Sequence, residues 1–107
     1  MTDFIFNDCS VCINPNRIER KDNTSHFEIK TAQFEGLWGV GIEWACSTAG
    51  FISGVSKNEC KFETETRAIR HGVEWLKRQL SKEKLKSDKL MKQLNEIIPQ
   101  TLQLSLF

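Results

Sequence analysis

The alternation of apolar and polar positions predicts three strands in the first half of the chain. Residues 26–34 alternate regularly, residues 37–46 read LWGVGIEWAC, and residues 51–55 form a shorter apolar run. Turn residues separate these runs at Glu35-Gly36 and at 47–50. Strand-length runs divided by glycine-containing turns are typical of β-hairpins in succession. The sequence therefore predicts a three-stranded antiparallel meander.

The second half of the chain carries a helical period. Thr64 is a good N-cap, Pro99 forbids simple continuation, and Glu83 and Ser87 interrupt the apolar positions between them. One unbroken helix would be about 50 Å long, more than twice the roughly 20 Å of a strand. We therefore favour a break or bend within 81–88, the alternatives being pairing with another helix or dimerisation through this region. The apolar positions are Ile69, Val73, Leu76, Leu80, Leu90, Leu94 and Ile97.

Together these patterns predict an α+β fold, a small antiparallel meander followed by a long or bent amphipathic helical region. A chain of 107 residues has the size of one domain. We place that domain at 1–98, with a polar lead-in at 1–24 built from turns and loop, the meander at 26–56 and the helical region at 64–98. Residues 99–107 are left as a tail.

The composition is that of a water-soluble protein, with 39% hydrophobic and 27% charged residues. No apolar run approaches the roughly 18 residues of a membrane span, and the start of the chain is acidic rather than signal-like. We therefore expect a cytoplasmic protein without a membrane partner. The charge is uneven: residues 1–66 carry six basic and ten acidic residues, whereas residues 67–92 carry nine and three.

The middle predicted strand holds two glycines and two tryptophans. Gly39 and Gly41 indicate a bulge, a close backbone approach or extra twist, and of these twist is the commonest reason. Trp38 and Trp44 share strand parity and should face the same side of the sheet. We expect them to be core residues; an open face would instead let them stack on nucleic acid bases.

Four cysteines leave two interpretations. Cys9-x-x-Cys12 is half of a zinc motif, and Cys46 and Cys60 are the preferred remaining ligands. Neither lies in a second motif of this kind, so the alternative is reduced thiols, with Cys46 and Cys60 buried as small apolar groups. We expect no cofactor, with zinc as the alternative.

Catalysis has little support in the sequence. There are two histidines, and neither a nucleophile elbow nor a phosphate-binding glycine loop is present. His71 lies beside Arg67 and Arg70, where positive charge should keep it neutral. We therefore expect a protein that is not an enzyme.

The basic helical segment suggests a nucleic-acid-binding face. On a continuous helix six basic side chains fall on one side, opposite the apolar positions. Such a stripe suits phosphate backbones, and it equally suits a solvated surface. The six are Arg67, Arg70, Arg78, Lys82, Lys89 and Lys92.

The tail carries the sharpest motif. Residues 103–107 read QLSLF. This pentapeptide resembles the motif by which bacterial replication and repair proteins bind the DNA polymerase sliding clamp. A strict match arises by chance in a chain of this length on the order of once in a thousand chains or less. The resemblance implies that Gln103 makes polar contacts at the pocket mouth, that Leu104, Leu106 and Phe107 fill the groove, and that Ser105 is the tolerant middle residue.

The clamp resemblance predicts a small adaptor that docks on the sliding clamp, with DNA contacts as an addition. A looser resemblance of residues 37–75 to small strand-strand-helix proteins of phages and plasmids fits a mobile-element protein. The alternative is a nucleic-acid-binding module whose apolar tail packs internally, since Leu102, Leu104 and Leu106 alternate as in a strand.

Overall fold

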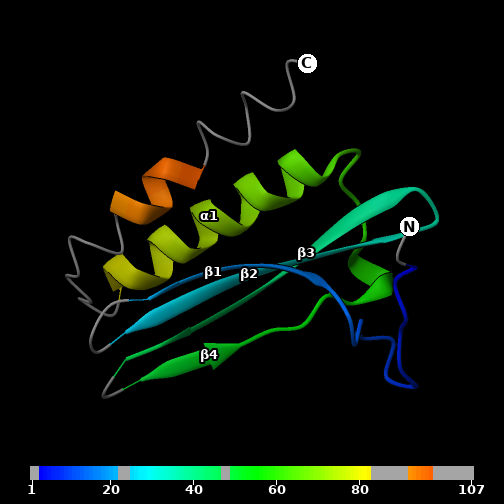
Figure 1. The fold of residues 1–107 in the computed structure, drawn as a ribbon, viewed down its shortest axis with the longest axis horizontal. Helices are drawn as coiled ribbons and strands as arrows, with labels where there is room; N and C mark the ends of the chain where they lie inside the picture. Colours follow the sequence, from blue (N-terminus) through cyan, green and yellow to red (C-terminus); the bar gives the residue numbers. More distant parts are fainter. Residues whose placement is uncertain (1–2, 22–24, 47–48, 83–91, 98–107) are drawn as a thin grey trace.

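The protein is a two-layer α+β structure (Figure 1). The computed structural model describes residues 3–21, 25–46, 49–82 and 92–97. Helix α1 packs on one face of an antiparallel sheet with the strand order β1-β2-β3-β4, and residues 92–97 form a second helix beside it. The elements are β1 (Asn16–Lys21), β2 (His26–Phe34), β3 (Leu37–Ala45), β4 (Gly50–Ile52), the 3-10 turn η1 (Lys57–Glu59) and α1 (Glu65–Lys82).

The sheet has four strands where three were predicted. β2 has the predicted bounds, β3 ends one residue earlier, and β4 is a shorter strand at the predicted position. β1 corrects the prediction of a polar lead-in without strands: it pairs with β2 from Asn16↔Thr31 to Lys21↔His26. Its only apolar residue is Ile18, because β1 is an edge strand that buries little surface. An alternation test cannot detect such a strand.

The β2–β3 hairpin has the turn that its sequence predicts. Glu35 and Gly36 both have positive φ, 54° and 84°. This is the handedness of a two-residue turn that matches the twist of the strands, and glycine adopts it without steric cost. The register is then continuous from Phe34↔Leu37 to His26↔Ala45.

The main core lies between the sheet and α1. Phe27 and Ile29 of β2 face the helix together with Ile42 and Trp44 of β3, which are their direct cross-strand partners. Trp44 is therefore a core residue, as predicted. Each of these side chains is at most 3% exposed. From the helices the same core receives Ile69, Val73, Leu76, Leu94 and Ile97.

Helix α1 begins where the sequence predicts. The Thr64 hydroxyl accepts a hydrogen bond from the Arg67 backbone N–H at 3.1 Å. Glu65, in the first turn, accepts hydrogen bonds from Thr31 at 2.7 Å and from Asn16 at 2.8 Å. The first turn of α1 is thus tied to both β1 and β2, which fixes the orientation of the helix on the sheet.

The helical region consists of two helices rather than one. α1 ends at Lys82, and most of the interval 81–88, where we predicted the break, lies outside the described residues. Leu94 and Ile97 are 0% and 3% exposed in the same core as α1. This part of the second helix therefore packs on the core that α1 forms with the sheet.

The other face of the sheet is partly covered by the N-terminal segment and by the chain after β4. Cys12, Ala32 and Val55 form a second small core there, with Phe4 and Phe6 against it. Gly41 shows why the sequence has a glycine in β3: a side chain there would collide with the backbone of Ser53 and Gly54. Of the three predicted explanations, a close backbone approach is thus the one that the structure supports.

Candidate functional site

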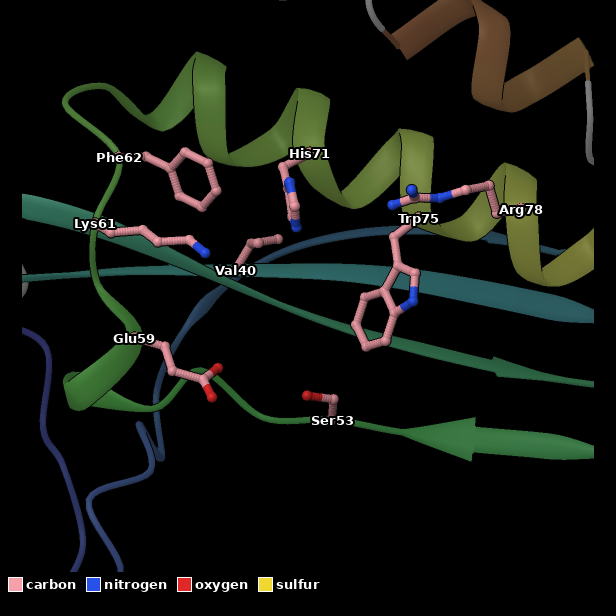
Figure 2. A pocket seen from close by; sticks show the side chains of 8 residues that line it. All are labelled: Val40, Ser53, Glu59, Lys61, Phe62, His71, Trp75 and Arg78. Atoms are coloured by element: carbon pink, nitrogen blue, oxygen red, sulfur yellow. The ribbon is translucent and has the colours of Figure 1, made fainter.

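A groove of about 240 Å³ lies along one flank of α1 (Figure 2). We call it the α1 groove. It is open to solvent between the helix and the segment that leads from β4 to α1. Its lining combines aromatic and charged side chains, which are contributed by β3, the segment 53–62 and α1. The lining residues are Val40, Ser53, Glu59, Lys61, Phe62, His71, Trp75 and Arg78.

Local structure places each side of the groove. His71, Trp75 and Arg78 are spaced by four and three residues, so they share one flank of the helix. On the other side, Phe62 is fixed by backbone pairing with Trp38, which donates to the Phe62 carbonyl at 2.7 Å and accepts from its N–H at 2.9 Å. This pairing positions the connection to α1 against the sheet.

The aromatic rings of the groove are held by ring contacts. The Phe62 ring lies 5.1 Å from the His71 ring, centroid to centroid. Trp75 makes an edge-to-face contact with Phe51 of β4 at 5.3 Å. Such contacts restrict the rotation of the rings. In Figure 2 the Trp75 indole extends from α1 across the groove toward β4, so one large aromatic side chain forms its end wall.

The electrostatics of the groove are dominated by two cations. In Figure 2 Lys61 and Arg78 extend toward each other from opposite ends, with His71 between them. Within the described part of the chain, neither Lys61 nor Arg78 has a carboxylate within ion-pair distance. The Lys61 ammonium lies 5.7 Å from the Phe62 ring centroid, a cation–π contact. Glu59 supplies the negative charge of the groove, on the side away from the helix.

The surroundings of His71 lower the pKa of its imidazole. Burial lowers the pKa of its imidazole most, and the positive charges of Lys61 and Arg78 lower it further. The sequence predicted a neutral His71 but attributed it to Arg67 and Arg70. In the structure the main cause of the lowered pKa is desolvation, and the cations that add to it are Lys61, which lies outside the helix, and Arg78.

A second charged cluster lies on the sheet face opposite α1. Glu28 of β2 accepts a hydrogen bond from Arg17 of β1 at 2.9 Å. Glu43 of β3 pairs with His26 at 3.0 Å and with Lys30 at 3.5 Å. The hydrogen bond with His26 is the main cause that lowers the pKa of Glu43, and Lys30 adds to it against the effect of burial. These pairs link three strands, so we interpret the cluster as structural.

The four cysteines proposed as zinc ligands do not lie in one place. Cys12 and Cys60 share the second core, whereas Cys46 packs against the main core and Cys9 is exposed. None of the four forms a disulfide. Among the residues that the structure describes, no three histidine, cysteine or acidic side chains are grouped to hold a metal ion.

Five of the six basic residues of the predicted stripe lie within the described residues. Arg67, Arg70 and Arg78 are exposed on α1, but Arg67 is paired with Glu63 at 3.3 Å. Lys82 is the last residue of α1, and Lys92 lies in the second helix. Lys89 lies outside the described residues. The geometry of a single helix, on which the stripe was predicted, therefore does not apply beyond Lys82.

The clamp-binding pentapeptide from Gln103 to Phe107, with Leu104, Ser105 and Leu106, also lies outside the described residues. Trp38, the second predicted core tryptophan, is half-buried and contacts Phe4 edge to face at 5.8 Å.

Sequence reasoning found only part of the α1 groove. His71 was considered as a catalytic residue and Arg78 as part of a basic stripe. Lys61, Phe62 and Trp75 were not identified as parts of a site. The spacing of His71, Trp75 and Arg78 along the helix is the one signal that could have joined three of them. Lys61 and Phe62 reach the groove only through tertiary pairing.

Comparison with known proteins does not identify a family. The chain matches no protein-family model, and neither the curated proteins nor the solved structures give a match. In the described part of the chain, no helix has the length and apolar character needed to cross a membrane.

Proposed function

We propose that this protein is an adaptor that docks on the bacterial DNA polymerase sliding clamp through residues 103–107. The observation that carries the proposal is the pentapeptide QLSLF, which fits the clamp-binding pattern at each of its five positions. The proposal is of a partner, not of a catalytic activity. A mobile-element origin and a place beside the replication machinery are part of the same hypothesis.

The described fold supplies the folded body of the proposed adaptor. The core beneath α1 is formed by residues between Phe27 and Ile97, and Leu94 and Ile97 cover it. The last described residue, Ile97, thus belongs to this core, six positions before Gln103. Pro99 then disfavours continuation of the second helix toward the motif.

The energy available from the motif is sufficient for specific binding. Burial of two leucines and one phenylalanine contributes roughly 1.5–3 kcal/mol each. Ordering of the peptide and loss of rigid-body freedom oppose this gain. We expect a dissociation constant near the micromolar range, which corresponds to a binding free energy of about −8 kcal/mol and so needs the polar contacts of Gln103 as well.

The direct test is binding of the full-length protein to a purified bacterial sliding clamp, measured by fluorescence polarisation. Replacement of Leu106 and Phe107 by alanine should weaken binding by about two orders of magnitude or more, because it removes most of the buried surface. Leu102→Ala is the matched control, since it removes an equal leucine one position before the motif. Equal binding by the full-length protein and by a variant truncated after Thr101 would show that the proposal is wrong.

The same variants separate clamp binding from internal packing of the tail. If the tail packs as a strand, Leu102→Ala and Leu104→Ala should lower the melting temperature alike, and Gln103→Ala should have little effect on it. If the tail serves the clamp, all three should melt like the unmodified protein. In that case only Gln103→Ala and Leu104→Ala should weaken clamp binding.

A further inference from the structure

The α1 groove holds an excess of positive charge, because Lys61 and Arg78 line it together with one carboxylate, Glu59. Lys61 and Arg78 converge on it from two different segments of the chain and have no carboxylate partner there within ion-pair distance. Surface cations usually point apart into solvent, where water and salt screen them. Two that converge on one concave site create a local potential that favours an anion.

The same groove offers an aromatic surface of restricted mobility. Trp75 and Phe62 line it, and each is held by a ring contact to a neighbour, Phe51 and His71 respectively. A volume of about 240 Å³ lies below the range of about 300–1,000 Å³ that is usual for drug-sized ligands. The groove therefore suits a small flat group that carries a negative charge at one side.

From these observations we propose that the α1 groove binds one nucleotide of single-stranded nucleic acid. The phosphate lies between Lys61 and Arg78, and the base stacks on Trp75. Glu59 and Ser53, on the side of the groove away from the helix, face the polar edge of the base. The Glu59 carboxylate accepts hydrogen bonds from base N–H groups and repels phosphate, so it fixes which way round the nucleotide enters. The proposal is independent of the clamp-binding pentapeptide.

Single strands are favoured over duplexes by the shape of the site. In a duplex the faces of the bases are stacked on one another, and only their edges are accessible in the grooves. A base can stack on Trp75 only after it leaves that stack. Aromatic side chains beside a positively charged groove are the recurring means of binding single strands without sequence preference.

The test is the fluorescence anisotropy of a labelled thymidine oligonucleotide of about twelve residues, titrated with the full chain at low salt. Trp75→Leu should weaken binding by about 5- to 150-fold, the range expected for loss of one base–aromatic stack. Trp75→Phe should restore most of it, because the variant keeps an aromatic ring. Circular dichroism and the melting temperature establish that each variant is folded.

The matched control distinguishes the groove from general attraction of charge. Arg78→Ala and Arg70→Ala remove the same charge from exposed positions of the same helix, but only Arg78 lines the groove. Arg78→Ala and Lys61→Ala should each weaken binding by about tenfold, and Arg70→Ala by less than about twofold, because only groove residues contact the phosphate.

Several outcomes would overturn the proposal. These are equal losses from Arg70→Ala and Arg78→Ala, equal affinity for a duplex of the same length, and no binding of the oligonucleotide at low salt. Binding of inorganic phosphate without binding of the oligonucleotide would overturn it too. Truncation after Thr101 should leave oligonucleotide binding unchanged, so this proposal and clamp docking can fail separately.

Discussion

Removal of the Leu94 side chain should destabilise the whole domain, although Leu94 lies outside α1 and the sheet. Leu94 is 0% exposed and belongs to the core cluster that contains Phe27, Trp44 and Leu76. Leu94→Ala removes the buried isopropyl end of the side chain and leaves a cavity beside residues of the sheet and of α1. We expect a loss of about 2–5 kcal/mol, the range measured for buried leucines.

That loss is large on the scale of a single domain, whose total stability is about 5–15 kcal/mol. For a chain of this size 1 kcal/mol corresponds to about 4–8 °C. The melting temperature should therefore fall by about 10 °C or more, and the midpoint of urea denaturation should fall with it. Both are measured on the full-length protein, by far-UV circular dichroism and by tryptophan fluorescence.

Leu37→Ala provides the comparison. Leu37 is 40% exposed at the start of β3, so truncation of its side chain leaves no enclosed cavity. We expect it to cost less than about 1 kcal/mol. Equal losses from Leu37→Ala and Leu94→Ala would refute the conclusion that residues 92–97 form part of the folded core. The segment from Ile97 to the pentapeptide would then not be attached to the folded core.

Three further predictions concern the sheet and the cysteines. The hydrogen bond with His26 is the chief cause that lowers the pKa of Glu43 in the folded protein. The stabilisation that the ionised Glu43 gives to the fold is complete above the unfolded-state pKa of about 4.3 and is lost as the pH falls through the lower folded pKa. Below about pH 4.3 the free energy of unfolding should therefore decline more steeply in the unmodified protein than in Glu43→Gln. Gly41→Ala should cost about 1–3 kcal/mol in urea denaturation, because the added methyl group collides with the backbone that crosses it. Burial is the main cause that raises the pKa of the Cys60 thiol, and Cys12 adds to it, whereas Cys9 is exposed. Cys9 should therefore react first with a thiol reagent at pH 8. A Cys9→Ser variant should lose this fast phase of the reaction.

The elements with the strongest local signals were predicted from the sequence, and the others depend on tertiary structure. The alternation in β2, the Glu35-Gly36 turn and the Thr64 cap each result from the chemistry of neighbouring residues. β1 has one apolar residue, Ile18, and forms because β2 offers it an edge with which to pair. A strand that forms because a neighbouring strand pairs with it, and not because of its own residue pattern, is difficult to predict from the sequence.

The candidate site likewise combines residues that the sequence points to with residues that only the tertiary structure brings there. His71 and Arg78 attract attention in the sequence because histidines are few and the helix is basic. The groove exists, however, because backbone pairing with Trp38 carries Phe62 and Lys61 to the flank of α1. The angular positions of the basic residues on a continuous helix predicted a single stripe. The structure places Arg78 of α1 and Lys61, from the segment before α1, around one small groove.

The two proposals gain force when they are considered together, because the pentapeptide and the groove belong to one short chain. Gln103 follows Ile97, which lies in the core, by six positions along the chain, a stretch that spans about 20 Å at most. A clamp bound through the pentapeptide would hold the α1 groove within reach of the DNA that the clamp encircles. A short tether of this kind gives a local concentration in the millimolar range. A groove that takes a single nucleotide weakly in free solution would then be occupied on the clamp. Groove variants such as Arg78→Ala should therefore weaken binding to a clamp loaded on primed single-stranded DNA, while they leave binding to the empty clamp unchanged.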